Sequence, residues 1–212
     1  MKNVNRKELA LTTLLCLLPI AAGLALYSKL PETVPTHFGF NGEADGWSSR
    51  ATAVFTMPLV MAGLNLFMHF GLSTDPKRQN MSAPLRAISI WTVPVVSILV
   101  SAFILSNALG YATHIEFIMP LLMGLLFILI GNFLPKTKQS YTMGIKLPWT
   151  LESEENWNRT HRLAGFLWVA AGAVMILLTL LHLWNLPLFL AVIAVMTLVP
   201  CAYSYLLYKK GI

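Results

Sequence analysis

The chain has 212 residues, of which 56% are hydrophobic and 11% are charged, and its formal net charge at pH 7 is +6. Soluble domains carry about 25% charged residues, so this composition excludes an ordinary water-soluble domain and favours a protein built for lipid. The basic residues are scattered between apolar runs, which argues against direct binding to nucleic acid. Cys16 and Cys201 both fall inside apolar runs, so a disulfide framework is not expected.

Six apolar runs are long enough to cross a bilayer, whose hydrocarbon core needs about 20 mostly apolar residues per helix. They cover residues 9–28, 51–71, 87–109, 116–134, 163–184 and 187–207. The first run follows the basic stretch MKNVNRKE and is similar to a signal peptide, but its length and the lack of a small-residue cleavage site favour a membrane helix. We predict an all-α membrane protein with six transmembrane helices, in which residues 1–212 form a single membrane domain.

The distribution of lysine and arginine predicts the orientation of the helices. With the N-terminus inside the cell, thirteen of the fifteen basic residues fall on the cytoplasmic side, and Lys29 and Arg50 lie outside. Cytoplasmic loops are enriched in basic residues, so we expect cytoplasmic N- and C-termini, in agreement with an even number of spans. Residues 29–50 then form an extracellular loop and residues 135–162 a cytoplasmic loop of a multi-pass protein of the bacterial cell membrane.

Proline and glycine positions indicate close contacts between the predicted helices. Prolines are tolerated in membrane helices where neighbouring helices compensate for the interrupted backbone bonding. Five runs contain one: Pro19, Pro58, Pro94, Pro120 and Pro200. Gly124 and Gly131 are seven residues apart, as are Gly165 and Gly172, so each pair shares a helix face on which another helix can approach closely.

Ionisable side chains do not occur near the midplane of any predicted span. His69, Glu116 and His182 fall near span ends, which predicts interfacial positions for all three. Asn65, Asn107 and Asn132 are each expected to hydrogen-bond between helices. Because charged groups inside membranes usually mark ion pathways, their absence disfavours an ion-coupled pump.

The extracellular loop, KLPETVPTHFGFNGEADGWSSR, is the largest external feature. Pro31 and Pro35 favour extended backbone, and the pairs Asn41-Gly42 and Asp45-Gly46 are turn signals. An exposed loop that combines proline, glycine and aromatic residues suits a shaped recognition surface.

Polar side chains of this loop are candidate binding residues: His37, Asn41, Glu43 and Asp45. Three of them match a calcium-loop pattern, but Thr52 stands at the twelfth position, where a bidentate glutamate is required. His37, Glu43 and Asp45 could hold zinc, although they lack a zinc-motif spacing. We therefore expect a recognition surface here rather than a resident metal.

The cytoplasmic loop begins with a basic segment and continues into a predicted helix. Its lysines would meet anionic lipid headgroups. Thr150 is predicted to cap the helix, with Glu152, Glu154 and Glu155 in the first turn, where carboxylates complement the helix dipole.

Aromatic and arginine side chains are concentrated on this cytoplasmic segment. Trp157, His161, Ala164 and Trp168 recur at helical spacing and so share one face. Aromatic and arginine residues are enriched at binding hot spots, which favours a docking surface for a soluble partner. The candidate docking residues are Trp149, Thr150, Trp157, Arg159 and Arg162. The alternative is that they anchor the loop at the lipid headgroups.

No nucleophile stands beside a base and an orienting carboxylate in a recognisable order, so we predict no catalytic residue and no cofactor.

The two loops together resemble the SdpI family of bacterial multi-pass membrane proteins. The resemblance lies in LPETVPTHFGFNGEADGW and in GNFLPKTKQSYTMGIKLPWTLESEENWNRTHRLAG. In the second segment, family-typical residues stand in family order: Gly131-Asn132, Pro135-Lys136, Gly144-Ile145, Pro148-Trp149-Thr150, Trp157 and His161-Arg162. Lys146-Leu147 departs from the common Arg-Thr but keeps a basic residue. The resemblance implies an immunity protein that protects its producer from a secreted peptide toxin, and a signalling role in which the toxin-bound protein captures a cytoplasmic repressor.

Two other functional classes compete with this interpretation. A small transporter or toxin exporter would use the proline-containing helices as a path, but no charge lies near a midplane. A metal-dependent membrane enzyme would use His37, Glu43 and Asp45, but their ligand set is incomplete.

Overall fold

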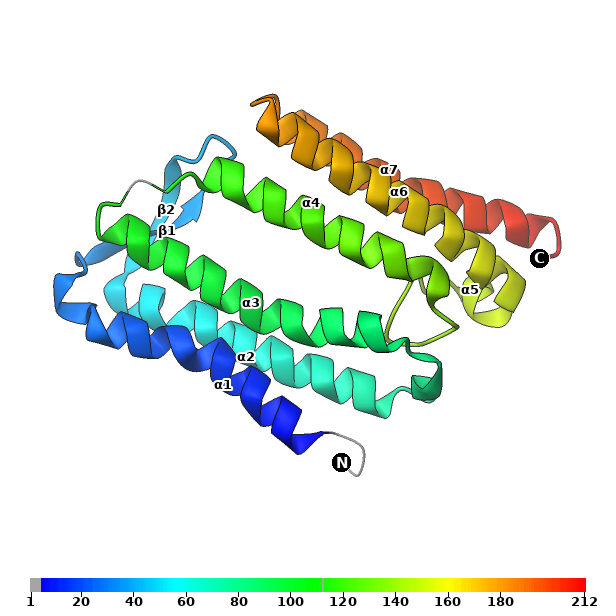
Figure 1. The fold of residues 1–212 in the computed structure, drawn as a ribbon, viewed down its shortest axis with the longest axis horizontal. Coiled ribbons are helices and arrows are strands. Elements are labelled where there is room, and N and C mark those ends of the chain that lie inside the picture. Colours follow the sequence, from blue (N-terminus) through cyan, green and yellow to red (C-terminus); the bar gives the residue numbers. More distant parts are fainter. Residues whose placement is uncertain (1–4, 112) are drawn as a thin grey trace. The chain divides into compact units, whose positions relative to one another are not determined.

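The computed structural model describes residues 5–111 and 113–212, which form two compact units (Figure 1). The first unit contains the chain up to Ser73 together with Ala87–Glu116, and the second contains Thr74–Arg86 and Phe117–Ile212. The assignment of the whole chain to one membrane domain stays a prediction.

Six long helices dominate the two units, and all six are long and apolar enough to cross a membrane, which confirms the predicted fold class. They are α1 (Arg6–Ala25), α2 (Arg50–Thr74), α3 (Ala83–Ala108), α4 (Ile115–Phe133), α6 (Glu154–Leu180) and α7 (Leu186–Lys209). The short helix α5 (Pro148–Glu152) precedes α6. The orientation of the termini stays a prediction.

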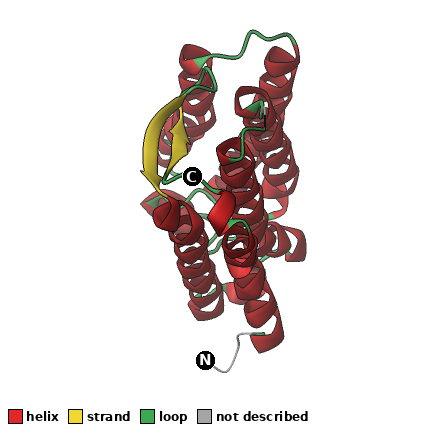
Figure 2. Cartoon of the chain, turned by 90° about the vertical axis from the view of Figure 1, so that its left-hand side faces the viewer, coloured by secondary structure: helices red, strands yellow, loops and turns green. Residues whose placement is uncertain are grey.

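The predicted extracellular loop folds into a β-hairpin of strands β1 (Thr33–Phe38) and β2 (Ala44–Ser49), drawn in yellow in Figure 2. Gly42 in the connecting turn has a φ of +79°, a conformation that favours glycine, so the turn predicted at Asn41-Gly42 is confirmed. The turn predicted at Asp45-Gly46 is wrong, because both residues lie within β2 and Gly46 pairs with His37.

Side-chain caps define the starts of three long helices. Asn5 and Asn185 accept hydrogen bonds from the backbone N–H groups of Glu8 and Leu188 at the starts of α1 and α7. Ser153 caps α6 in the same way, with the N–H of Asn156 3.1 Å from its Oγ. The prediction of Thr150 as this cap is therefore wrong: Thr150 lies inside α5, and the first turn of α6 contains two carboxylates rather than three.

The helix prolines face the interior of the units, as packing against partner helices requires. All five are buried: Pro19, Pro58, Pro94, Pro120 and Pro200.

In the first unit, a buried polar cluster joins α1 to α2. Asn65 donates hydrogen bonds from Nδ2 to the hydroxyl oxygens of Thr12 and Thr13, at 3.0 and 2.9 Å, which confirms the predicted interhelical role of Asn65. His69 Nε2 lies 3.1 Å from Thr12 Oγ1. His69 is 3% exposed and so is buried among the helices of this unit, while its position near the membrane interface stays a prediction.

In the second unit, α4 and α6 pack through two glycine pairs. A Cβ built on Gly124 would lie 2.8 Å from the carbonyl oxygen of Gly172, and one built on Gly131 would lie 2.8 Å from that of Gly165. In the opposite direction, a Cβ built on Gly172 would lie 2.4 Å from the carbonyl oxygen of Gly124, and one built on Gly165 would lie 2.7 Å from that of Gly131. Real Cβ contacts are not this short, so only glycine allows the two backbones to approach so closely.

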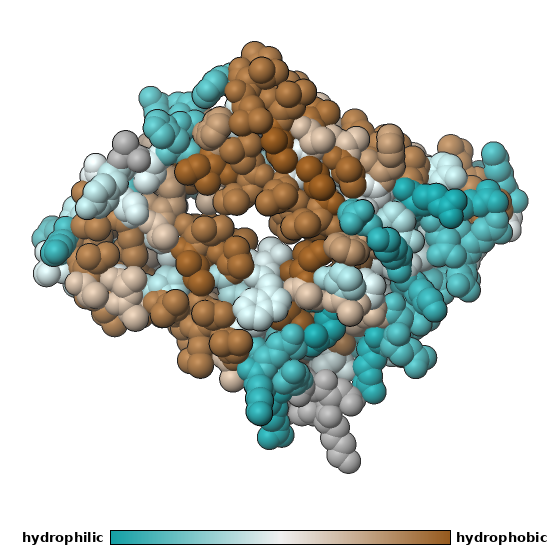
Figure 3. Space-filling model, viewed as in Figure 1, coloured by the Kyte–Doolittle hydropathy of each residue, from teal (hydrophilic) through white to brown (hydrophobic). Residues whose placement is uncertain are grey.

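The outer surfaces of the helices are apolar. Large hydrophobic side chains that are about two-thirds exposed or more include Leu14, Phe67, Phe166 and Leu198. Figure 3 shows apolar side chains over the lengths of the helices and hydrophilic side chains gathered near their ends. Large exposed apolar surfaces are rare on water-soluble monomers, so these faces suit contact with hydrocarbon.

Candidate functional site

The β-hairpin of the first unit has one covered face and one open face. On the covered face, Val34 is fully buried in a cluster with Ala53 and Ile104, and the Phe38 ring meets the Phe103 ring edge-on at 4.8 Å. These contacts hold the hairpin against α2 and α3. The alternation of side chains along a strand then directs His37 and Asp45 to the open face.

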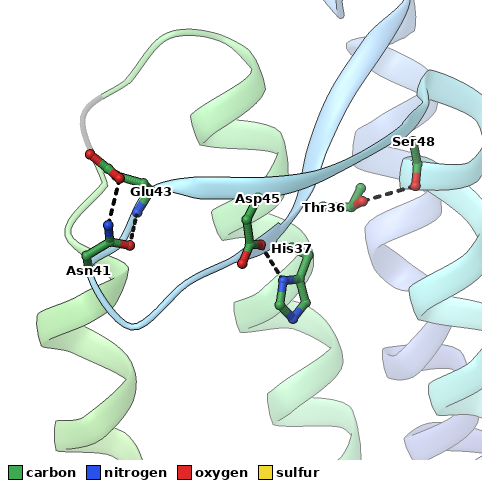
Figure 4. A network of polar contacts seen from close by, with 6 residues as sticks. All are labelled: Thr36, His37, Asn41, Glu43, Asp45 and Ser48. Atoms are coloured by element: carbon green, nitrogen blue, oxygen red, sulfur yellow. Dashed lines mark hydrogen bonds and ion pairs between the residues drawn. The ribbon is translucent and has the colours of Figure 1, made fainter. Parts of the chain in front are cut away.

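The four binding residues predicted from the sequence form two adjacent pairs on this hairpin (Figure 4). His37 Nδ1 lies 2.5 Å from Asp45 Oδ1, and the two side chains are 75% and 54% exposed. At the turn, Asn41 donates from Nδ2 to Glu43 Oε2 at 2.6 Å, and its own Oδ1 accepts the backbone N–H of Glu43 at 3.2 Å. The structure thus places all four predicted residues on one hairpin, where each exposed polar side chain is held by a hydrogen bond to another.

The hairpin turn also lies beside a carboxylate that the sequence interpretation placed only at a helix end. A Cβ on Gly42 would meet Glu116 Oε2, the end of a flexible side chain that can move aside, so the preference for glycine there rests on its positive φ. Glu116 also contacts His114, with 3.2 Å between Oε1 and Nδ1. Only tertiary folding brings Glu116 beside Gly42, more than seventy residues earlier in the chain.

Among residues 5–111 and 113–212, no group of three or more His, Cys, Asp or Glu side chains is arranged to hold a metal ion. What the open face of the hairpin offers is a polar contact surface.

In the second unit, His161 organises the predicted cytoplasmic loop. Its ring donates from Nδ1 to the carbonyl oxygen of Trp157 at 2.8 Å, and Nε2 accepts the backbone N–H of Ile145 at 2.9 Å. Only a neutral imidazole with its proton on Nδ1 can make both hydrogen bonds at once, because it donates from Nδ1 and accepts at Nε2. The ring also stacks on the Trp157 indole, with ring centroids 3.9 Å apart.

Gly144 allows the loop to approach this pair of rings. Its φ is +100°, and a Cβ at this position would lie 2.5 Å from His161 Nε2 and 2.8 Å from the Trp157 ring. Trp157 in turn donates from its indole nitrogen to the carbonyl oxygen of Thr137 at 2.8 Å. The motif residues Gly144, Trp157 and His161 therefore form one packed unit.

A second structural role belongs to Thr150, which is fully buried. Its Oγ1 accepts the N–H of Leu147 at 2.9 Å and lies 2.8 Å from the carbonyl oxygen of Ile145, to which it can donate. Thr150 thus closes the turn that leads into α5.

The predicted docking residues differ in how much of them reaches the surface. Trp157 and Thr150 are fully buried, so they shape the loop from within. Trp149 is half-buried: its indole N–H donates to Ser204 Oγ at 2.7 Å, and its ring packs against two tyrosine rings of α7. Arg159 is paired with Glu155, and Arg162 is exposed. The docking assignment stays a prediction. Of the five predicted residues, a partner could contact Trp149, Arg159 and Arg162 at the surface.

Residues 137–152 form a loop module, which Asp75 contacts from the connection between α2 and α3. Sequence reasoning missed this role of Asp75. It is 4% exposed and accepts hydrogen bonds from the Ser140 hydroxyl at 2.7 Å and from the backbone N–H groups of Tyr141 and Thr142 at 3.0 and 2.9 Å. Its other oxygen accepts the N–H of Lys77 at 2.7 Å.

Burial raises the pKa of the Asp75 carboxyl group, but the hydrogen bonds that it accepts outweigh burial and hold the pKa below its ordinary value of 3.8. Asp75 therefore anchors the loop module as a carboxylate. The one available sequence signal was an acidic residue within an otherwise basic connection between two spans.

Six apolar helices, a polar hairpin and a separately packed loop module define a multi-pass helical membrane protein. Residues 136–204, which include the loop module, match the SdpI/YfhL protein family, so the resemblance to the SdpI family is confirmed. Residues 14–62, which include the hairpin, match a domain of unknown function, DUF1648.

Two relatives extend this comparison. The chain is 28% identical over 205 residues to the immunity protein SdpI of Bacillus subtilis strain 168, covering 96% of this chain and 97% of that protein. It is 51% identical over 49 residues to an uncharacterized protein of Archaeoglobus fulgidus, covering 23% of this chain and 25% of that protein. No solved structure matches the chain.

Proposed function

We propose that this chain is a membrane immunity protein that protects its producer cell from a secreted peptide toxin. The observation that carries the proposal is similarity along almost the whole chain, over 96% of its residues, to a protein named for immunity. In this role the chain is a binding protein of the bacterial cell membrane and not an enzyme.

The hairpin is the proposed receptor surface. It holds the exposed pairs His37–Asp45 and Asn41–Glu43, and the distribution of basic residues favours an extracellular position for it. Exposed polar side chains on a loop that a rigid scaffold positions are a common means of recognition.

The experiment is deletion of the gene in its native host, followed by re-expression and challenge with the host's secreted peptides. Wild-type protein should restore growth. The double variant His37→Ala/Asp45→Ala removes the His37–Asp45 contact without leaving either partner unpaired, and it should reduce protection by about tenfold or more, the equivalent of about 1.4 kcal/mol of binding energy.

Glu32→Ala is the matched control, because Glu32 is exposed at the base of the same hairpin but outside both pairs. Its protection should equal that of the wild type. Membrane abundance is measured for every variant. Equal growth of the deletion strain with and without the wild-type gene would refute the immunity function.

The cytoplasmic module supports a second role, docking of a soluble regulator such as a repressor. The observation that favours it is that Arg162 is exposed and Trp149 half-buried on a loop held in place by His161 and Asp75. A rigid surface loses little conformational entropy when a partner binds.

A further inference from the structure

Strand β2 lies at the edge of the two-stranded sheet. The sheet has two antiparallel strands, and among the residues that the structure describes β2 pairs with β1 alone. An edge strand presents a row of unpaired backbone N–H and C=O groups, which another extended chain can bind.

The register shows which groups of β2 point outward. The backbone N–H of Arg50 donates to the carbonyl oxygen of Glu32 at 3.1 Å, just beyond the paired residues Thr33 and Ser49. Hydrogen-bonded and non-hydrogen-bonded pairs alternate along an antiparallel ladder. The pairs Thr33–Ser49 and Pro35–Trp47 therefore occupy non-hydrogen-bonded positions.

The lack of an N–H group on Pro35 agrees with this register, since proline is tolerated where the backbone nitrogen faces away from the partner strand. It follows that the N–H and C=O groups of Trp47 and the N–H group of Ser49 point away from β1, toward the open edge, whereas the carbonyl of Ser49 is used at the start of α2.

The two edges of the hairpin are not equally protected. Proline, β-bulges and lysine are the usual means of blocking an edge strand. On β1, Pro35 lacks a donor and the adjoining register shift leaves Thr36 as an extra residue. On β2, the second shift affects Asp45, and the segment Gly46–Ser49 that follows is regular and contains neither proline nor lysine.

The side chains along the β2 edge indicate the chemistry of its partner. Glu43 and Asp45 are exposed, and Glu116 lies beside the turn. The neighbouring Arg50 is held at Tyr27, with its guanidinium 5.4 Å from the ring centroid. Trp47 is 60% exposed and can receive a lysine or arginine side chain on its ring. Charge complementarity therefore favours a basic chain.

We propose that the open edge of β2 binds an extended, basic segment of the peptide toxin as a third strand. The Trp47 and Ser49 main-chain groups would supply the hydrogen bonds, while Trp47 and the carboxylates would select basic side chains. The inference rests on the proposed immunity function and adds the mode of recognition to it.

Proline substitutions on the two edges test the proposal. Ser49→Pro removes an outward N–H, whereas Ser49→Ala keeps it; both lose the bond from the Thr52 N–H to Ser49 Oγ, which is 3.2 Å long in the wild type. Thr33→Pro makes the same change on the β1 edge. Protection is measured against the secreted peptide fraction that kills the deletion strain.

Ser49→Pro should lower by about tenfold the concentration of the peptide fraction that the cells survive. Ser49→Ala and Thr33→Pro should stay within about twofold of the wild type at equal membrane abundance. Failure of the wild-type gene to protect refutes the proposed function together with the inference. Protection by the wild type and by Ser49→Pro alike refutes the edge inference alone.

Amide hydrogen exchange gives a second readout that does not depend on how the variants fold. The wild-type protein in lipid nanodiscs is compared with and without the peptide purified from the active fraction. Slower exchange at Trp47 and Ser49, with Thr33 unchanged, supports the third strand. Unchanged exchange at Trp47 and Ser49, or equal slowing at Thr33, overturns it.

Discussion

Gly172→Ala tests whether the close approach of α4 and α6 stabilises the second unit. The added Cβ would lie 2.4 Å from the carbonyl oxygen of Gly124, while an ordinary contact begins at 3.4 Å, so a gap of 3.4 − 2.4 = 1.0 Å must open. It would also meet Ile128 Cγ1 at 2.9 Å. The Gly124 oxygen belongs to a helix backbone, so it cannot move aside as the end of a flexible side chain can.

Overpacking of this kind costs about 1–3 kcal/mol. For a chain of this length that corresponds to a fall in melting temperature of about 2–4 °C per kcal/mol. Thermal unfolding of the purified protein in detergent, followed by loss of helical circular dichroism, measures the shift. Gly131→Ala, whose Cβ would lie 2.8 Å from the oxygen of Gly165, should behave similarly.

Gly63→Ala is the matched control. Gly63 also lies in a membrane helix, α2, but a Cβ there would meet nothing within 4 Å. Alanine is the better helix former by about 0.8–1.0 kcal/mol, so this variant should melt at or above the wild-type temperature. Equal melting temperatures for the Gly172 and Gly63 variants would refute the close-packing argument.

Three further predictions concern topology, the loop anchor and docking. With Cys16 and Cys201 replaced, Glu32→Cys should react with an impermeant thiol reagent in intact cells and Glu152→Cys only after lysis; the reverse pattern would contradict the orientation derived from the basic residues. Asp75→Asn should lower stability at pH 7 by about 1–3 kcal/mol, because the Asp75 carboxylate loses its charge-assisted hydrogen bonds. Since the folded pKa of Asp75 is lowered, its stabilisation is complete above the ordinary value of 3.8 and is lost as pH falls through the folded pKa. The melting temperatures of variant and wild type should therefore differ at neutral pH and converge as pH falls through that lowered pKa; a constant difference would exclude the anchor role. Trp149→Ala/Arg162→Ala should abolish pull-down of a cytoplasmic regulator while toxin protection is retained, and joint loss of protection and abundance would assign the loop a structural role.

Sequence alone predicted the features that depend on local chemistry. Hydrophobic runs of about 20 residues can be satisfied only by helices in lipid, so six spans follow from composition and length. The turn at Asn41-Gly42 follows from the freedom of glycine at positive φ, and the paired glycines in two runs indicated helix faces suited to close contact.

Tertiary structure decided which of those faces and groups meet. The order of the chain does not say that Gly124 meets Gly172, or that Asp75 meets the backbone at Tyr141 and Thr142 more than sixty residues later. Ser153 rather than Thr150 caps α6, because Thr150 is already bonded to Ile145 and Leu147 inside the folded loop. Local propensity offers several partners for each polar group, and the long-range packing of the helices selects among them by bringing one partner within bonding distance.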